Sequence, residues 1–498
     1  MDMMISGLAM VLQPANFLYL LGGTFVGIIF AAMPGINGLT CAVLFIPFTY
    51  YLGIIPSLIV LCAMYQGSNF GGSITAALLN IPGDPAAICT TFDGHPMAKQ
   101  GKAGKAIGAA LFASSLGGII GGVILVTVGP AVAEIAMNMG APEIFMFIFF
   151  GLTTIASIAG SSLLSGFISM FFGLLLASIG ISPVTGSERF VFGSSYLLGG
   201  IDFVVAIMGL FALTEVFYRH TSDITTYSTT AFNHTRTELP SWSEIKANLK
   251  VNIPRSSIIG VIVGAIPAAG ATIAAILSYG VAKQFSKHPE KFGTGVIEGV
   301  FAPEAANNAS AAGAVMTMLT LGIPGSATTA IILGAFLIAG VEPGPMIFVT
   351  NPEVVQAAFG SMLLCNIAVF FLGVFLTRFF VKAMSLPLWI LDPMIVVFSY
   401  LGVFSIRNSF ADVIIMTLFG VLGYVMRRID LSVGPLMLAL VLGPIAEKSF
   451  VTSMRISDTG LMIFVTSPVS LILLIFSLLS LFIPLAHRYW GRIKAAIA

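Results

Sequence analysis

The chain has 498 residues, of which 57% are hydrophobic and 9% charged, and its formal net charge is +1. Charged residues normally make up about a quarter of a soluble domain, so this composition excludes a soluble globular protein. A net charge near zero also argues against a nucleic-acid partner. Apolar runs of membrane-spanning length recur along the chain without strand-like alternation, which predicts an all-α polytopic membrane protein.

The first two apolar segments are each interrupted by proline and glycine. Residues 16–52 are interrupted from Pro34 to Gly38, and residues 57–98 are interrupted from Ile81 to Pro85. Breaks of this kind inside apolar segments are typical of discontinuous membrane helices. Uninterrupted apolar segments follow at residues 106–137, 143–160, 163–181 and 196–217.

The same pattern starts again after a polar stretch, residues 219–255, which is rich in Thr and Ser. Residues 256–282 are interrupted at Pro267, and residues 294–340 are interrupted at Pro324. Uninterrupted segments follow at residues 356–384, 387–403, 411–426, 434–446 and 460–485. The expected parts are a first transmembrane repeat (1–218, with hairpin and broken helix 16–98 and scaffold helices 106–217), a polar connecting loop (219–255) and a second transmembrane repeat (256–498, with hairpin and broken helix 256–340 and scaffold helices 356–485).

The interrupted segments of the two halves match each other, but the charges of their loops do not. One constant offset superposes Ser68 on Ser310, and a slightly smaller one superposes Gly27 on Gly260. The Lys residues of loop 99–105 and of loop 283–291 have no basic counterparts in the other half. Because Lys and Arg accumulate on the cytoplasmic side, matched loops of opposite charge character predict inverted-topology repeats. The basic connecting loop and C-terminus are expected to be cytoplasmic.

Segment 256–282 has basic residues on both flanks, so both of its ends are expected on the cytoplasmic side. Each arm around Pro267 has about a dozen residues, whereas a full span takes roughly 20, which predicts a re-entrant hairpin. By inversion, residues 16–52 would form a hairpin that opens to the other side. One long kinked helix remains the alternative for each segment.

The breaks are expected to form the binding site, because freed helix N–H ends attract anions and freed carbonyl ends attract cations. No Lys or Arg lies within the broken motifs, so a carboxylate would be held by amides, hydroxyls and helix ends, with a co-bound cation as charge partner. The expected substrate-binding residues are Asn37, Gly38, Ser68, Asn69, Pro82, Gly83, Gly270, Thr272, Ser310, Pro324, Gly325 and Ser326. The expected ion-coupling residues are Asp84, Gly35, Ser73, Thr75, Asn307, Asn308, Thr317 and Glu304. Na⁺ near the breaks or H⁺ would be the co-transported ion, the Na⁺ ligands are left unassigned, and no cofactor is expected.

Simpler interpretations exist for several of these residues. Asp84 precedes Pro85, which suits a helix N-cap, so an additional ion or proton role is an open alternative. Glu304 could instead lie on a solvated helix face at the membrane edge. Asp93 and His95, beside a Lys-rich loop, are interpreted as surface residues. Ser and Thr in membrane helices often bond their own helix, glycines often only pack, and the four scattered cysteines are interpreted as small buried hydrophobes.

Two runs carry a resemblance to a known family: Gln66-Gly67-Ser68 through Asp84-Pro85, and Ala302-Pro303-Glu304 through Gly325-Ser326. They resemble the large membrane subunit (TctA-type) of the bacterial tripartite tricarboxylate transporters, over essentially the whole chain. The resemblance implies a multi-pass secondary transporter of the inner membrane that imports carboxylates on an ion gradient. It also implies two partners, a small four-helix membrane subunit and a periplasmic solute-binding protein. The Pro-Gly-x-Gly pattern expected from the family is incomplete at both the Pro34 and the Pro267 break.

An elevator-like movement of the hairpins and broken helices is expected only by analogy with other carboxylate carriers. An anion channel, or a carrier working without a binding protein, is the alternative function. An enzyme is not expected, because the sequence has no HExxH or GxSxG motif, and no P-loop supports ATP-driven transport. The identity of the carboxylate, citrate or another, and the choice between sodium and proton coupling stay open.

Overall fold

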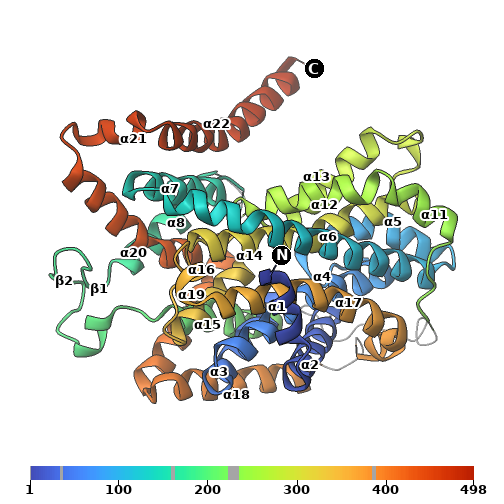
Figure 1. The fold of residues 1–498 in the computed structure, drawn as a ribbon, viewed down its shortest axis with the longest axis horizontal. Coiled ribbons are helices and arrows are strands. Elements are labelled where there is room, and N and C mark those ends of the chain that lie inside the picture. The colour runs from blue at the N-terminus through green and yellow to red at the C-terminus, as the bar shows by residue number, and fades with distance from the viewer. Residues whose placement is uncertain are drawn as a thin grey trace. The chain divides into compact units, whose positions relative to one another are not determined.

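The computed structural model describes residues 2–33, 37–158, 163–221, 235–267, 269–383 and 388–497. The chain divides into two compact units (Figure 1). Unit 1 comprises Met1–Glu134 and Phe211–Ser409, and unit 2 comprises Ile135–Leu210 and Phe410–Ala498.

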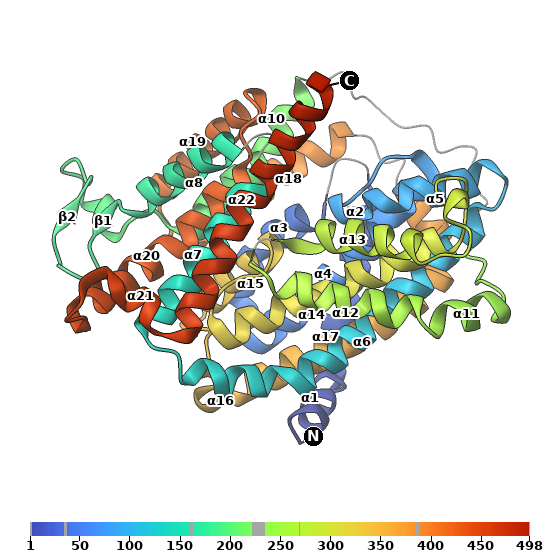
Figure 2. The same cartoon turned by 90° about the horizontal axis from the view of Figure 1, so that it is seen from above.

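Unit 1 contains all four of the segments that the sequence predicts to be interrupted. Its first part contains α1 (Asp2–Val11), α2 (Pro14–Ala32), α3 (Gly38–Leu52), α4 (Ile54–Leu79), η1 (Pro85–Ala87), α5 (Ile88–Lys99) and α6 (Ala103–Met137), which runs on past the unit boundary. Its second part contains α10 (Thr214–His220), α11 (Trp242–Leu249), α12 (Asn252–Ala265), α13 (Gly270–Gln284), η5 (Pro289–Lys291), α14 (Glu298–Leu321), α15 (Ala327–Ile338), α16 (Ile347–Thr350), α17 (Pro352–Ala383) and α18 (Leu388–Arg407). Helices α12 and α13 both pack on α14 (Figure 2).

Unit 2 is built from apolar helices and one short hairpin. Its elements are α7 (Ala141–Ile158), α8 (Leu163–Ala177), β1 (Gly180–Ile181), β2 (Glu188–Arg189), η2 (Ser195–Gly199), α9 (Phe203–Ile207), the π-helical η3 (Met208–Leu213), α19 (Phe410–Arg428), α20 (Val433–Ile456), η6 (Gly460–Met462), α21 (Ile463–Thr466) and α22 (Pro468–Ile497). The strands pair antiparallel, with Gly180 opposite Arg189. Arg189 donates to both carboxylate oxygens of Glu447 at 2.9 and 3.0 Å, which fixes the hairpin against α20.

The helices confirm an all-α polytopic membrane protein. Among the described residues, 7 helices are long and apolar enough to cross a bilayer, and up to 8 if a pair bent by 92° at its break counts as one span. The 7 are Pro14–Ala32, Ile54–Leu79, Ala103–Met137, Phe203–His220, Pro352–Ala383, Phe410–Arg428 and Val433–Ile456, and the bent pair is Gly460–Thr466 with Pro468–Phe482.

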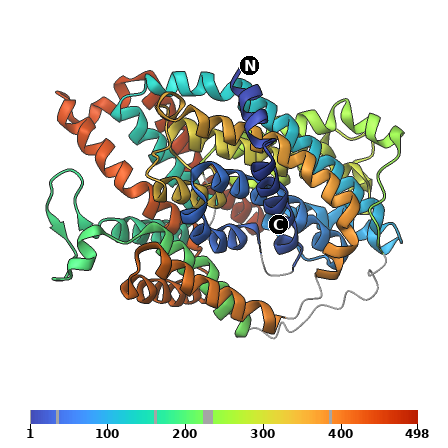
Figure 3. The ribbon, with the colours of Figure 1, turned by 60° about the horizontal axis from the view of Figure 1, so that its bottom comes forward.

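The helix breaks lie where the sequence predicts them. Helix α4 ends before Asn80, whose left-handed φ of 60° stops it, and α14 ends before Gly322, whose φ is 70°. Helix α12 ends at Ala265 and α13 begins at Gly270, and α2 and α3 end and begin on either side of the Pro34 motif. Of that motif, residues 34–36 lie outside the described residues. The blue helices of the first motif come to the front in Figure 3.

Close helix packing depends on four glycines, each so near the backbone of a facing helix that a Cβ would collide with it. They are Gly27 and Gly71 at the α2–α4 contact, and Gly260 and Gly313 at the α12–α14 contact. Their partners, in the same order, are Met64, Ile28, Ala306 and Val261. Residues matched between the two halves in the sequence thus make matching contacts. Small residues allow this approach of helices that lack a strong hydrophobic driving force in lipid.

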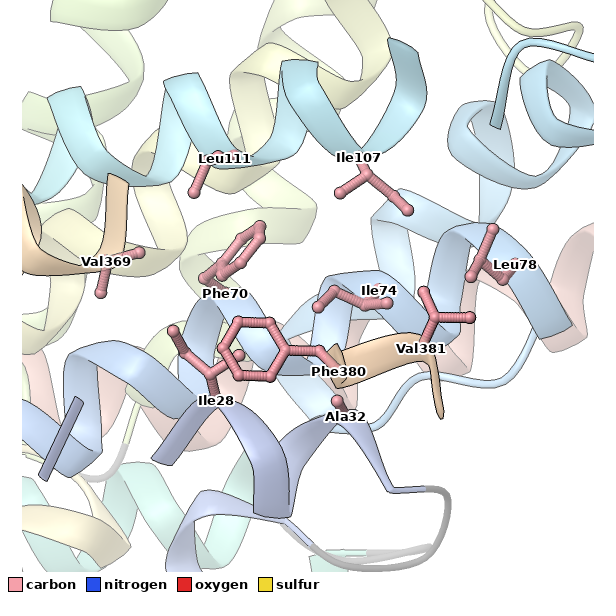
Figure 4. Close-up of a cluster of buried hydrophobic side chains, with 10 residues drawn as sticks. All are labelled: Ile28, Ala32, Phe70, Ile74, Leu78, Ile107, Leu111, Val369, Phe380 and Val381. Atoms are coloured by element: carbon pink, nitrogen blue, oxygen red, sulfur yellow. The ribbon is translucent and has the colours of Figure 1, made fainter. Parts of the chain in front are cut away.

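An apolar core packs α2 and α4, each of which ends at a helix break, against α6 and α17. Side chains from α2, α4, α6 and α17 meet around Phe70 and Phe380, both fully buried (Figure 4). Because aromatic and branched side chains fill this volume, α4 has its whole middle section buried. The polar residues of α4 are therefore inside the protein and must find partners there.

Candidate functional site

Two helices with buried amide side chains, α4 and α14, cross in unit 1 and bind each other reciprocally. The Gln66 side-chain amide donates to the Asn308 carbonyl at 3.3 Å, and the Asn308 amide donates back to the Gln66 carbonyl at 3.5 Å. Asn69 and Asn307 form a second reciprocal pair, at 3.5 and 3.4 Å. All four side chains are at most 2% exposed. The crossing therefore collects polar groups that water does not reach.

Three amide oxygens at this crossing have no hydrogen-bond partner among the described residues: Gln66 Oε1, Asn307 Oδ1 and Asn308 Oδ1. Leaving a buried acceptor unpaired costs about 1–3 kcal/mol. In each case the amide nitrogen is used and the oxygen is left over. The crossing can therefore accept a cation or a water molecule.

Glu304 lies one helical turn before these amides and is itself 1% exposed. Its Oε1 accepts hydrogen bonds from Ser73, at 2.5 Å, and from Thr90, and its Oε2 accepts one from Ser114 at 2.8 Å. Ser73 Oγ also lies 3.4 Å from the Asn69 carbonyl, which connects the carboxylate to the amide crossing. The alternative of a solvated position for Glu304 is wrong, because α4, α5 and α6 cover this turn of α14.

Each Pro-Gly break after α4 and α14 ends in a helix cap. Asp84 Oδ1 accepts from the Ala86 amide at 3.0 Å, so the predicted capping role is confirmed. Ser326 Oγ accepts from the Thr329 amide at 3.2 Å and lies 3.0 Å from the Tyr65 hydroxyl. Neither cap uses all of its polar capacity on its own helix. Asp84 also lies next to Gly38 of α3, and Ser326 lies next to Tyr65 of α4, so each cap links its own helix to a neighbouring helix.

The start of α3 meets the first break. Asn37 caps α3 by accepting from the Thr40 amide at 2.9 Å. A Cβ on Gly38 would collide with the Ser68 side chain and lie 3.7 Å from Asp84 Oδ2. The structure thus brings Gly38, Ser68 and Asp84 together, around the N-terminal end of a helix. Such an end carries partial positive charge.

Several of the predicted site residues serve their own helix or fill the breaks. Ser68, Ser310, Thr75 and Thr317 donate to the carbonyls of Tyr65, Asn307, Gly72 and Ala314 respectively. Among the break residues, Gly83, Pro324 and Gly325 are buried, whereas Pro82, and Gly270 and Thr272 in the first turn of α13, are half-buried. Gly35 lies outside the described residues. The side chains that meet one another are those of the amide crossing, the Glu304 cluster and the two caps.

Sequence reasoning missed several members of the site, namely Tyr65, Gln66, Thr90, Ser114 and Asn366. Asn366 on α17 accepts from the Asn308 amide at 3.5 Å and is fully buried. One signal was available: the offset that matches Ser68 with Ser310 also matches Gln66 with Asn308, and these two residues bind each other. Thr90 and Ser114 gave no local signal, because their role depends on where α5 and α6 pack.

Asp93 is a buried structural residue, so its interpretation as a surface residue is wrong. It is 0% exposed, and its Oδ1 accepts from the amides of Gly293, Gly295 and Val296, each at 2.9 Å. Its Oδ2 accepts from the Tyr279 hydroxyl at 2.9 Å. The carboxylate holds the loop that leads into α14 against α5. His95, by contrast, is half-buried and lies 3.1 Å from the Ala77 carbonyl.

We expect Asp93→Ala to destabilise the protein by at least about 3 kcal/mol, because three buried amides and a hydroxyl lose their acceptor. Tyr279→Phe removes one of these bonds and should cost about 1–1.5 kcal/mol. Glu342→Ala, in an exposed loop, should change the stability by less than about 0.5 kcal/mol. Thermal unfolding in detergent measures all three. Equal losses for Asp93→Ala and Glu342→Ala would contradict this role.

Comparison with known proteins gives a consistent result. Residues 17–438 match the model of the family described as "Tripartite tricarboxylate transporter TctA family". The chain is 35% identical over 470 residues, 94% of this chain and 93% of the relative, to an Agrobacterium vitis protein described as "Uncharacterized 52.8 kDa protein in TAR-I ttuC' 3'region". It is 39% identical over 215 residues, 43% of this chain and 89% of the relative, to a second A. vitis protein, "Uncharacterized protein in TAR-II ttuC' 3'region". No solved structure matches it.

Proposed function

The chain belongs to the tripartite tricarboxylate transporter TctA family, and from this premise we propose that it imports tricarboxylates or related carboxylates across the bacterial inner membrane by secondary, ion-driven transport. The family is a transporter family. As a member of a tripartite system, the chain would work with a small four-helix membrane subunit and receive substrate from a periplasmic solute-binding protein. The multi-pass helical fold is consistent with this role.

The observation that carries the ion-driven part is the set of three unpartnered amide oxygens at the crossing of α4 and α14, which Ser73 connects to the Glu304 carboxylate. Among the described residues, no basic side chain lies within 4.0 Å of Glu304. A buried charge without a partner costs several kcal/mol. Neutral oxygen ligands together with one carboxylate suit a hard cation such as Na⁺. We therefore assign Na⁺ as the co-transported ion.

The substrate is proposed to bind at the helix breaks. Gly38 begins α3 next to Asp84, and Ser326 is the N-cap of α15 next to Tyr65. The N-terminal ends of both helices therefore lie at the breaks, where the carboxylate groups of a substrate would bind. Gly270 begins α13 with a positive φ of 65°, which a residue with a side chain adopts at a cost. Nearby hydroxyls and amides would fix the orientation of the substrate, and the bound Na⁺ would offset its charge.

An inverted duplication with re-entrant hairpins is proposed for the fold, and an elevator-like displacement of unit 1 elements for the movement. The matched glycine contacts at α2–α4 and α12–α14 support the duplication. The reciprocal bonds between Gln66 and Asn308, which occupy matched positions, support a pseudo-two-fold axis at the crossing. In other carriers such an axis passes through the site. The elevator movement rests on analogy alone.

Uptake into proteoliposomes tests the proposal. They would contain this chain and its small partner subunit, with binding protein and labelled citrate outside, and a sodium or a proton gradient would be imposed separately. We expect saturable uptake that follows the sodium gradient. Uptake that follows protons alone would contradict Na⁺ coupling, and unsaturable flux without any gradient would favour the alternative of an anion channel. Uptake without the binding protein would favour an independent carrier.

Asn308→Ala should raise the Na⁺ concentration needed for half-maximal uptake by about tenfold, because it removes one of the three unpartnered oxygens. Thr320→Val is the matched control on the same helix, since among the residues that the structure describes Thr320 donates only to the Met316 carbonyl of its own helix. Its Na⁺ dependence should equal that of the wild type. An unchanged Na⁺ dependence in Asn308→Ala would exclude this oxygen from the ion site.

A further inference from the structure

A polar pocket lies at the opposite end of α12 from its break. It has a volume of about 160 Å³ and is lined by residues of α11, α12, α13 and the start of α14. Among its lining residues are Asn248, Asn252, Arg255, Phe285 and Glu298. None of these belongs to the site at the helix breaks.

Arg255 provides a cation to this pocket without a carboxylate partner. Its Nη2 donates to Asn252 Oδ1 at 3.2 Å, and its guanidinium lies 5.5 Å from the centroid of the Phe285 ring. Its Nε is buried and has no hydrogen-bond partner among the described residues. Within the same residues, no carboxylate lies within 4.0 Å of it. Burial lowers the pKa of this guanidinium, and no acidic group opposes that effect. The Arg255 guanidinium is therefore available to bind an anionic group.

Glu298 provides the opposite charge to the same pocket. It lies in the first turn of α14, is half-buried, and has no basic side chain within 4.0 Å among the residues that the structure describes. The residues that line this one pocket thus include an arginine and a glutamate that are not paired with each other. A simple anion would satisfy Arg255 but would be repelled by Glu298. A ligand with both a negative and a positive group satisfies both residues.

The surroundings of the pocket have the character of a membrane–water interface. Two of its lining residues, Val251 and Phe285, are 58% and 71% exposed, and Trp242 on the neighbouring α11 is 71% exposed. Exposed lysines flank them on α11 and α13, at Lys246, Lys250 and Lys283. Exposed aromatic residues next to lysines are typical of segments at the level of lipid headgroups. The ligand would therefore come from the membrane.

We propose that this pocket binds the phosphoethanolamine headgroup of a membrane phospholipid, with Arg255 on the phosphate and Glu298 on the ammonium. Arg suits phosphate because its planar donors match two phosphate oxygens. The pocket lies between α12, α13 and α14, so a bound lipid would hold these three helices together at the end away from the Pro267 break. The exposed lysines around the pocket would by themselves favour an anionic lipid. We expect the opposite preference, with the zwitterionic lipid binding better than an anionic one.

Lipid titration of the purified full chain, followed by native mass spectrometry, tests the proposal. Phosphatidylethanolamine and phosphatidylglycerol with the same acyl chains are compared. The wild type should bind one phosphatidylethanolamine about tenfold more tightly than phosphatidylglycerol. Arg255→Gln should lower phosphatidylethanolamine affinity by about tenfold or more. Glu298→Gln should bring phosphatidylethanolamine down to the phosphatidylglycerol level while phosphatidylglycerol binding is retained. A misfolded variant cannot reproduce that change of preference.

Two further arms complete the test. Lys283→Gln, an exposed control of equal charge change, should leave the ratio of the two lipid affinities within about twofold. Soluble phosphoethanolamine should displace the lipid, whereas inorganic phosphate at the same concentration should not. The proposal would be overturned by equal binding of both lipids by the wild type, by an undiminished phosphatidylethanolamine affinity in Arg255→Gln, by an unchanged preference in Glu298→Gln, or by equal displacement with inorganic phosphate.

Discussion

Glu304→Gln is expected to reduce sodium-driven uptake by at least about a hundredfold while the protein stays folded. The substitution keeps the shape of the side chain and one acceptor oxygen for Ser73 and Thr90. The new amide faces the Ser114 hydroxyl, which can rotate to accept its hydrogen bond. The variant loses the negative charge that, in our proposal, binds the cation. Uptake in proteoliposomes and thermal unfolding of the same preparation measure the two effects.

Glu304→Ala removes both the charge and the hydrogen-bond acceptor, so its comparison with Glu304→Gln separates the two effects. It leaves the buried hydroxyls of Thr90 and Ser114 without their acceptor and Ser73 with only the Asn69 carbonyl at 3.4 Å, so it should destabilise the protein by at least about 3 kcal/mol. Glu353→Gln, an exposed carboxylate at the start of α17, is the control and should change neither uptake nor stability. Sodium-driven uptake at the wild-type rate in Glu304→Gln would mean that the carboxylate is only a structural acceptor.

Gly83→Val and Gly325→Val are each expected to disrupt the packing at a helix break and to lower the free energy of unfolding by more than about 3 kcal/mol. A Cβ on Gly83 would collide with the Ala31 carbonyl and lie 2.5 Å from Thr75 Oγ1. A Cβ on Gly325 would collide with the Gly264 carbonyl and lie 2.6 Å from the Ala314 Cα. Because backbone atoms cannot move aside as a side chain does, the chain around each break must shift. Unfolding temperature in detergent and uptake should both fall.

Controls for these two variants are available on neighbouring helices. Gly22 on α2 and Gly280 on α13 have no atom within 4 Å of an added Cβ. Gly22→Val and Gly280→Val should therefore cost less than about 1 kcal/mol each. If Gly83→Val and Gly325→Val were as stable as these controls, the close packing at the breaks would be contradicted. Unequal damage at the two breaks would weaken the proposed equivalence of the two halves.

The helix breaks could be predicted from the sequence because their causes are local. Proline and glycine interrupt apolar segments, and Asp84 and Ser326 precede helices as N-cap residues do. These signals depend on a few neighbouring residues and not on the rest of the fold. The membrane class followed from composition for the same reason. The crossing of α4 and α14 could be predicted in part, since Gln66 and Asn308 occupy matched positions in the two halves of the sequence.

The environments of Glu304 and Asp93 could not be predicted, because both depend on contacts between residues that are distant in the chain. Glu304 is bonded by Ser73, Thr90 and Ser114, which lie about 200 residues earlier. Asp93 binds the loop around Gly295, 202 residues later. No local pattern distinguishes a carboxylate caged in this way from one at the membrane edge. The short helix Trp242–Leu249 inside the predicted polar loop was also missed, although Ser241 and Glu244 form a capping box at its start, which is a local signal.

Sodium-dependent thermal unfolding of the purified chain tests the central claim most directly, because it requires neither partner nor substrate. An ion that binds only the folded state stabilises it by about 2.7 kcal/mol at a concentration of 100 times its Kd. We predict that NaCl raises the unfolding temperature above that in equal KCl or choline chloride, and that Glu304→Gln and Asn308→Ala reduce this difference. The same unfolding temperature in all three salts, or an undiminished sodium effect in Glu304→Gln, would contradict a cation site at the crossing of α4 and α14.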